Sequence, residues 1–317
     1  MRVTEIIQAA KKPLFTFELV PPLKGRTLEP LMETIRTLME FDPSYINVTN
    51  HQAEVVYIER EDGLLQRKTV RKRPGTTALA ALIQHTFNVP TVAHLICGGM
   101  SREQIEDVLI ELHFLGIENI LALRGDPPAG EKRFIPMPDG HAYSSQLVGQ
   151  IVDLNHGRYL DDQYRDGEAT RFSIGVAGYP EKHAEALNMT VDLANLKKKV
   201  DAGAQYIVTQ MFFDNGKYFS FVNACRSIGI TVPIIPGLKP IASKRDLSLI
   251  PQTFGVDLPE ALTSELEGVD SNAEITEIGV QWCIAQSKEL YAAGVPSIHY
   301  YTLGKARNVA RIVRAVY

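Results

Sequence analysis

Short apolar segments alternate with longer segments of helical spacing along the whole chain. The short segments are almost continuously apolar, which is typical of strands that are covered on both faces in a parallel sheet. Eight segments have this character, and the predicted strands span 14–20, 45–49, 91–97, 119–124, 172–178, 206–212, 233–238 and 297–303.

The segments between the predicted strands carry the signals of amphipathic helices. In 101–112 the apolar residues form one stripe, Ser101 and Gln104 have the spacing of a capping box, and Gly116 follows as a stop. The segment 192–203 repeats this pattern, with lysines on the outer face and a glycine at its end.

Repeated strand and helix units close most simply into a single (β/α)8 barrel of the TIM type, an α/β fold, with an open doubly wound sheet as the alternative. A length of 317 residues suits one such domain spanning 1–317, and no linker divides the chain. Two irregular segments, 126–140 and 155–171, are predicted to be surface excursions.

The composition favours small-molecule partners over nucleic acid or a membrane surface. A net charge of -4 provides no field that would attract nucleic acid or an anionic membrane. The one basic cluster, at 68–73, is predicted to be a solvated face, although it could meet an anionic substrate tail. Its members are Lys68, Arg71, Lys72 and Arg73.

Three widely separated cysteines, Cys97, Cys225 and Cys283, form neither a disulfide framework nor a metal motif. The N-terminal residues lack the apolar region of a signal peptide, and no apolar run reaches the length of a membrane span. We therefore expect a cytoplasmic protein.

Polar residues gather where the predicted strands end, and in a barrel all those ends face one mouth. Glu18 lies among apolar neighbours in the first strand, where a carboxyl group holds its proton more readily than in water, as a general acid requires. A buried ion pair with Arg or Lys is the equally weighted alternative.

Other candidate residues at the mouth also have plainer interpretations. The Arg124-Gly125-Asp126 segment could hold a cofactor ring or form a tight turn with a local Arg–Asp pair. His94 and His183 lack metal-ligand spacing, so hydrogen-bonded core histidines are the alternative to functional ones. Neither a Gly-x-Gly-x-x-Gly pattern nor a P-loop is present.

Five segments in order resemble the methylenetetrahydrofolate reductase family of bacterial type, reduced to its catalytic barrel. They are Phe15-Thr-Phe-Glu-Leu-Val-Pro-Pro22, Leu121-Ala-Leu-Arg-Gly-Asp-Pro-Pro128, Gly175-Val-Ala-Gly-Tyr-Pro-Glu-Lys-His183, the run from Lys199 to Gln210, and His299-Tyr-Tyr-Thr-Leu303. Together they cover nearly the whole chain.

The resemblance implies an oxidoreductase of one-carbon metabolism and methionine biosynthesis. Such enzymes hold noncovalent FAD, accept reducing equivalents from NADH or NADPH, and reduce 5,10-methylenetetrahydrofolate to 5-methyltetrahydrofolate in a ping-pong cycle. The family also implies a homo-oligomer. A regulatory domain like that of eukaryotic relatives is not expected.

The resemblance assigns site residues by position in this chain. Glu18 matches the general acid that opens the methylene bridge, Asp126 the acid beside flavin and pterin, and Gln210 the amide that binds folate, with Tyr301 as a further substrate contact. The cofactor shell carried over, beside Asp126 itself, comprises Thr49, His94, Leu123, Arg124, Gly125, Ala177, Tyr179, His183, Asp192, Asn195 and Lys199.

Three positions depart from the family pattern. Thr49-Asn50-His51 stands where members often have Thr-Tyr-Gly, Ile250 lies where relatives place an aromatic residue, and Gly304 replaces a frequent asparagine. Two other interpretations stay open: a cofactor-free pterin-binding methyltransferase barrel and a noncatalytic folate-binding subunit. The electron donor cannot be read from the sequence.

Overall fold

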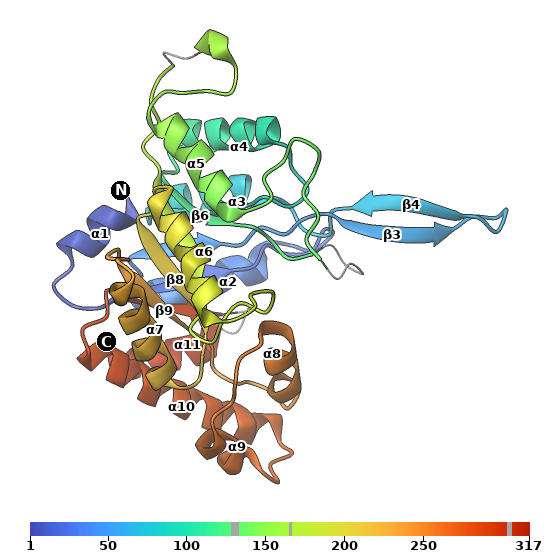
Figure 1. Ribbon diagram of the computed structural model, residues 1–317. Helices are drawn as coiled ribbons and strands as arrows, with labels where there is room; N and C mark the ends of the chain where they lie inside the picture. Colours follow the sequence, from blue (N-terminus) through green and yellow to red (C-terminus); the bar gives the residue numbers. More distant parts are fainter. Residues whose placement is uncertain (128–132, 165–166, 303–305) are drawn as a thin grey trace.

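The computed structural model describes residues 1–127, 133–164, 167–302 and 306–317 (Figure 1). Within these ranges, eight parallel strands close into a barrel in the order β1-β10-β9-β8-β7-β6-β5-β2. They are β1 Leu14–Leu19, β2 Tyr45–Val48, β5 Thr91–Ile96, β6 Asn119–Leu123, β7 Ser173–Gly178, β8 Tyr206–Met211, β9 Ile234–Leu238 and β10 Ser297–Tyr301. The predicted barrel is confirmed, and the open sheet is wrong.

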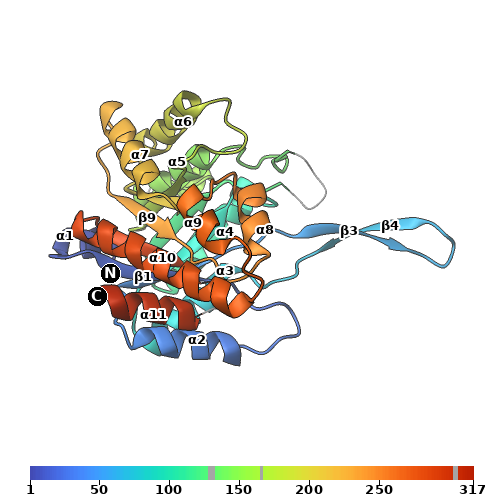
Figure 2. The ribbon, with the colours of Figure 1, turned by 90° about the horizontal axis from the view of Figure 1, so that it is seen from below.

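Helices surround the barrel and connect its parallel strands. They are α1 Val3–Ala9, α2 Glu29–Met39, α3 Thr76–Phe87, α4 Arg102–Phe114, α5 Ser144–Asn155, α6 Met189–Asp201, α7 Asn215–Ser227, α8 Asp246–Phe254, α9 Glu260–Leu266, α10 Asn272–Ala292 and α11 Ala306–Val316. Figure 2 shows α10, α11 and α2 side by side along one flank of the barrel.

The predicted helix signals hold at two connections. In α4, the Ser101 hydroxyl accepts a hydrogen bond from the backbone N–H of Gln104 at 3.3 Å, and the Gln104 side chain accepts one from the Ser101 N–H at 3.0 Å, which is the expected capping box. Helix α6 begins before the predicted segment, because Asn188 caps it by accepting from the Val191 N–H at 2.9 Å.

Helix α1 covers the end of the barrel where the strands begin. The N–H of Val3 donates to the side-chain oxygen of Asn119 at 2.7 Å, and Val3 packs on the lowest layer of inward side chains. That layer contains Tyr45, Val92, Leu121, Tyr206 and Ile235. Because this end is filled, the opposite end of the barrel is the one open to ligands.

The main hydrophobic core lies between the barrel strands and the surrounding helices. A second cluster packs α8, α9 and α10 against the segment after β9, and it contains Ile241, Ile250 and Leu262. Gly279 of α10 lies against that segment so closely that a Cβ there would stand 2.1 Å from the Ile241 carbonyl oxygen. Helix α10 therefore contacts backbone directly at this point.

An antiparallel hairpin, β3 Glu54–Glu59 and β4 Leu65–Val70, was not predicted from the sequence. It follows β2 and projects on the side opposite α1 (Figures 1 and 2). Its turn contains Asp62 and Gly63, with Gly63 at a φ of 73°. Most residues of the hairpin are exposed, so its sequence shows no alternation of apolar and polar positions that would indicate a buried face.

The basic cluster at 68–73 lies on β4 and just after it. Lys68 and Arg71 are exposed, as predicted, and Lys72 pairs with Glu54 at 2.5 Å. Arg73 departs from the solvated-face prediction, since it is half-buried and donates to the backbone carbonyl of Pro21. The end of this cluster therefore fastens the hairpin to the segment that follows β1.

The structure also bears on the predictions about the irregular segments, the cysteines and membrane spans. The described parts of 126–140 lack helix and strand. After Asn155, where α5 ends, the described part of 155–171 holds only a short 3-10 helix, Asp162–Tyr164. Residues 128, 303 and 304, which belong to predicted segments, lie outside the described residues. The three cysteines are buried and unpaired. None of the described helices has the length and apolar character required to cross a membrane.

Candidate active site

Alternating residues of β10, β1 and β2 place polar side chains inside the barrel near its open end. Glu18 of β1 is level with Tyr301 on β10 and with Asn47 on β2, and Thr16 is level with His299. Since side chains two apart on a strand share a face, Thr16 and Glu18 point the same way, as do His299 and Tyr301.

Glu18 is enclosed at this rim. Its side chain is 10% exposed, and its carboxylate Oε2 lies 3.7 Å from His299 Nε2. Its backbone carbonyl accepts a hydrogen bond from the Thr302 hydroxyl at 2.8 Å. Among the described residues, no Arg or Lys lies within ion-pair distance of this carboxylate, so the structure favours the isolated buried acid over the alternative of an Arg or Lys ion pair.

Beneath Glu18, a set of buried polar groups fills the barrel interior. Asn47 contacts His299 Nδ1 at 3.5 Å, His94 Nε2 at 3.3 Å and the Thr16 hydroxyl at 3.3 Å. Burial lowers the pKa of His94 to about 4, so this ring is neutral at physiological pH. His94 thus occupies the hydrogen-bonded core setting that the sequence left open as its alternative.

The end of β6 presents a different arrangement from a local Arg–Asp pair. Arg124 forms an ion pair with Glu185 at 2.7 Å, and its guanidinium lies 5.0 Å from the Phe134 ring centroid. Asp126 is exposed, and its backbone carbonyl accepts from the Gln52 amide at 2.5 Å. The predicted tight-turn pair is therefore wrong, because Arg124 reaches across to the loop after β7.

Gly125, between these two residues, has a φ of 89°. This is the left-handed region, where a side chain would be strained, so glycine suits the position. Leu123, two residues before Gly125, is partly buried and packs on the barrel interior.

The loop after β7 and helix α6 bring further predicted cofactor residues together. Lys199 donates to the Ala177 carbonyl at 2.9 Å and lies 5.8 Å from the Tyr179 ring centroid. The Tyr179 and His183 rings are 4.7 Å apart edge to face, and Asp192 accepts from the His183 N–H at 2.9 Å. These five residues form one contiguous group.

Burial lowers the pKa of Lys199 to about 8, with Asp192 opposing the shift. Arg124 lies within electrostatic reach of both Lys199 and His183. Asn195 is exposed, and its side-chain oxygen accepts from Lys198 of the same helix at 3.4 Å, so the structure does not join Asn195 to this group. The β6 and β7 ends and α6 otherwise form one polar wall, in which Arg124 lies beside Glu185 and Lys199 beside Asp192.

Two side chains link the Glu18 region to this polar wall. Burial lowers the pKa of His51 and Arg73 lowers it further, whereas Glu18 and Asp126 oppose the shift. Burial raises the pKa of Tyr301, with Glu18 and then Tyr179 adding to the rise. Glu18 and Asp126 are therefore both within electrostatic reach of one ring, as residues around one mouth should be.

The β8 and β10 ends complete the mouth. The Gln210 side-chain oxygen accepts from the Met211 N–H at 2.9 Å, which leaves its amide nitrogen without a partner in the described chain. The Tyr301 hydroxyl donates to the Thr209 carbonyl at 2.7 Å. Tyr301 is thereby fixed in place, and Gln210 keeps donors for a ligand.

Thr49, at the end of β2, has a buried hydroxyl oxygen with no hydrogen-bond partner among the described residues. Buried polar groups are nearly always satisfied, so an orphaned hydroxyl at a barrel mouth marks a place for a bound group. Together with Arg124, His183 and Lys199, it suits a polar, anionic cofactor. No metal-binding cluster of His, Cys, Asp or Glu occurs in the described ranges.

Several mouth residues were not predicted from the sequence. Lys239 follows β9, is 8% exposed, and pairs with Asp246 of α8 at 3.2 Å. His299 and Asn47 are two more, although each lies two residues before a predicted site position, at Tyr301 and Thr49. Strand alternation is the signal that could have found both. Ile250 is buried in the α8 cluster.

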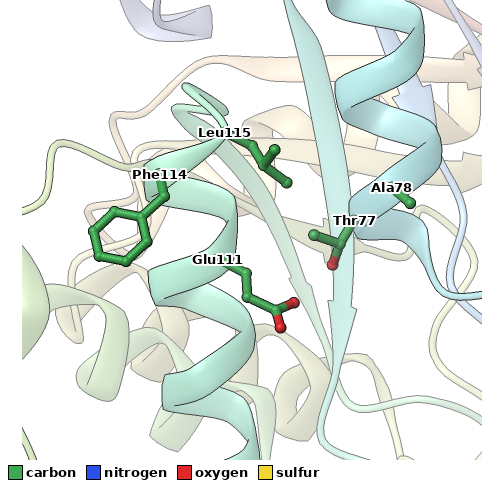
Figure 3. A pocket seen from close by; sticks show the side chains of 5 residues that line it. All are labelled: Thr77, Ala78, Glu111, Phe114 and Leu115. Atoms are coloured by element: carbon green, nitrogen blue, oxygen red, sulfur yellow. The ribbon is translucent and has the colours of Figure 1, made fainter.

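A surface pocket lies elsewhere, between α3 and α4 on the outside of the barrel (Figure 3). Thr77, Ala78, Glu111, Phe114 and Leu115 line it. It lacks the converging polar groups of the mouth, and chemistry is better placed where several strand ends meet.

Comparison with known proteins agrees with this geometry. The family model described as methylenetetrahydrofolate reductase matches residues 2–316. A protein of Oryza sativa subsp. japonica named probable methylenetetrahydrofolate reductase (NADH) is 33% identical, over 99% of this chain and 50% of its own length. The 5,10-methylenetetrahydrofolate reductase of Pectobacterium carotovorum subsp. carotovorum is 32% identical, over 92% of this chain and 86% of its own.

The chain spans about half the length of the plant relatives it matches. Among solved structures, an uncharacterized protein from Clostridium thermocellum, described as binding two copies of 5-methyl-5,6,7,8-tetrahydrofolic acid, aligns with a TM-score of 0.54. It is 14% identical, over 99% of this chain and 98% of that one. At this identity the likeness shows a shared barrel fold.

Proposed function

Because this chain belongs to the methylenetetrahydrofolate reductase family, we propose that it reduces 5,10-methylenetetrahydrofolate to 5-methyltetrahydrofolate with a nicotinamide nucleotide and a bound flavin. The observation that carries the proposal is the enclosed carboxyl of Glu18 at the mouth, without an Arg or Lys partner among the described residues. Such a group suits proton donation. A single domain spanning 1–317 is part of the same proposal.

The mouth fits FAD in charge and in hydrogen-bonding capacity. When bound, the flavin supplies hydride chemistry that no protein side chain provides. Arg124, His183 and Lys199 would hold its anionic phosphates or ribityl chain, and the unpaired Thr49 hydroxyl would accept or donate one further hydrogen bond. Thr49, at the end of β2, lies apart in sequence from these three residues.

The remaining residues would act on folate. Glu18 would donate a proton to the nitrogen that leaves the methylene carbon, and Asp126 would stabilise the positive charge that develops there. Gln210 would bind the pterin through its free amide nitrogen, and Tyr301 would form part of the substrate wall. This division of labour follows the family resemblance residue by residue.

The first test is whether the purified protein carries or takes up flavin and catalyses the reaction. We expect visible flavin absorbance, bleached in stopped flow by NADH or NADPH and restored by 5,10-methylenetetrahydrofolate. Relatives named for each donor exist, so both must be tried. Colourless protein that gains no bands with FAD would contradict the proposal and favour a cofactor-free barrel.

Flavin affinity should depend on pH through Lys199. Its pKa of about 8 must rise when a phosphate binds beside it, because an anion favours the charged form. The affinity for FAD is therefore at its maximum below pH 8, where Lys199 is protonated. Above pH 8 the affinity falls, by at most about tenfold per pH unit for one proton. Fluorescence titration of the apoprotein with FAD from pH 7 to 10 measures this.

Two variants make that prediction specific. Lys199→Met should bind FAD more weakly and with no such pH dependence, because the titrating group is gone. Lys197→Met should behave as the wild type, since Lys197 pairs with Asp201 on the same helix. A pH dependence that persists in Lys199→Met would refute the assignment.

A further inference from the structure

The buried polar groups beneath Glu18 determine one another's hydrogen-bonding directions. Thr16 is fully buried, Asn47 and His299 are each 1% exposed, and His94 is 4% exposed. Bulk water therefore cannot satisfy these groups, and each donor must meet an acceptor within the protein.

The orientation of the Asn47 amide follows from Thr16. The Thr16 hydroxyl donates its single hydrogen to the Tyr45 carbonyl at 2.8 Å, so toward Asn47 it can only accept. Asn47 must therefore direct its NH2 group to Thr16, at 3.3 Å, and its oxygen to His94, at 3.3 Å. The reverse orientation would set two acceptors against each other.

The amide orientation in turn fixes both histidines. The Asn47 NH2 group faces His299 Nδ1 at 3.5 Å, so that nitrogen must accept and carries no proton. A neutral ring then has its proton on Nε2, which is the atom 3.7 Å from the Glu18 carboxylate. His94 is likewise neutral and donates from Nε2 to the Asn47 oxygen.

We infer that Thr16 and Asn47 lock His299 in the tautomer with its proton on Nε2, and that His299 is a positioning residue that directs this N–H at Glu18. The inference deepens the proposed function and rests on it for the chemical purpose of Glu18. A fixed N–H on one side of the carboxyl group holds that group in one orientation toward the mouth, where it can pass its proton to the substrate.

Four titratable side chains face Glu18 from the elements around it. His299 and Tyr301 come from β10, His94 from β5, and His51 from the loop after β2. His94 is neutral at physiological pH and the phenol of Tyr301 holds its proton, because burial moves both pKa values in those directions. Burial also lowers the pKa of His51, the other imidazole within electrostatic reach of Glu18 in the described part of the chain.

Nitrogen-15 NMR of the histidine side chains tests the tautomer without any turnover. We expect the His299 signals, assigned by their loss in His299→Phe, to show a proton on Nε2 and none on Nδ1 at pH 7. Asn47→Leu removes the donor to Nδ1 and should produce a mixture of tautomers. A wild-type ring protonated on Nδ1, or on both nitrogens, would overturn the inference.

The pH dependence of folate reduction tests the positioning. His299→Phe removes the N–H that faces the Glu18 carboxyl group, so the pH at which the rate falls by half should shift by about one unit, the effect of losing one contact to a charged group. Flavin reduction by the nicotinamide nucleotide should be unchanged. A purely structural defect would lower the rate equally at all pH values, and that result would reject the positioning.

The two experiments separate the possible failures. A wild-type protein that shows the Nε2 tautomer but never reduces 5,10-methylenetetrahydrofolate would contradict the proposed function while leaving the lock on His299 intact. If His299→Phe does not fold, the wild-type spectrum and that of Asn47→Leu still decide the tautomer.

Discussion

Replacing Glu18 with Gln should slow reduction of 5,10-methylenetetrahydrofolate by roughly 10²- to 10⁴-fold, the range typical for loss of a general acid. The carboxamide has nearly the same shape as the carboxyl group but cannot donate an acid proton. The site of Glu18→Gln should therefore still bind folate, and Arg124, His183 and Lys199 are untouched. Reduction of bound flavin by the nicotinamide nucleotide should keep its wild-type rate.

Stopped-flow measurement of the two half-reactions separates these effects. Glu33→Gln is the matched control, because Glu33 is an exposed carboxylate on α2, outside the mouth. It should leave both half-reactions unchanged. Folate turnover that survives in Glu18→Gln would remove Glu18 from the chemistry and would favour a noncatalytic folate-binding subunit.

The largest effect on stability is expected for Gly279→Ala. The added methyl group would stand 2.1 Å from the Ile241 carbonyl oxygen, which is backbone and cannot rotate away. Helix α10 would have to move from the segment after β9. We expect the free energy of unfolding to fall by about 3 kcal/mol, at the upper end for overpacking a buried site.

Gly149→Ala is the matched control, since Gly149 also lies inside a helix but has open space, with nothing within 4 Å, where a Cβ would stand. Alanine is the better helix former, so this variant should gain about 0.5–1 kcal/mol. Urea unfolding of both variants measures the contrast. Equal effects would mean that helix propensity, and not the contact with Ile241, decides the outcome.

The barrel strands could be predicted because each is apolar on both faces, and this leaves a continuous signal in the sequence. The hairpin of β3 and β4 could not be predicted in the same way. Its residues are largely exposed, so no buried face imposes a pattern on the sequence. The start of α6 could not be placed from apolar spacing, because the Asn188 cap that sets it lies ahead of the apolar stripe.

At the site, the acid on β1 was evident as a charged residue in an apolar strand. Its setting could not be predicted, since His299 is 281 positions away in sequence and meets Glu18 only because β10 pairs with β1. Arg124 likewise joins Glu185 from another loop, where local sequence suggested Asp126. Such contacts form only when the barrel closes and brings distant strands together. Local sequence patterns do not indicate which strands will be neighbours.

The pairing of β1 with β10 has a consequence for synthesis on the ribosome. A nascent chain that has not yet exposed residue 301 contains Glu18 but neither the neighbouring strand nor His299 and Tyr301. Its first strand must wait with one edge unpaired, a state in which strands are prone to join other chains. Chaperone protection during translation should therefore matter most for the residues around Leu14–Leu19.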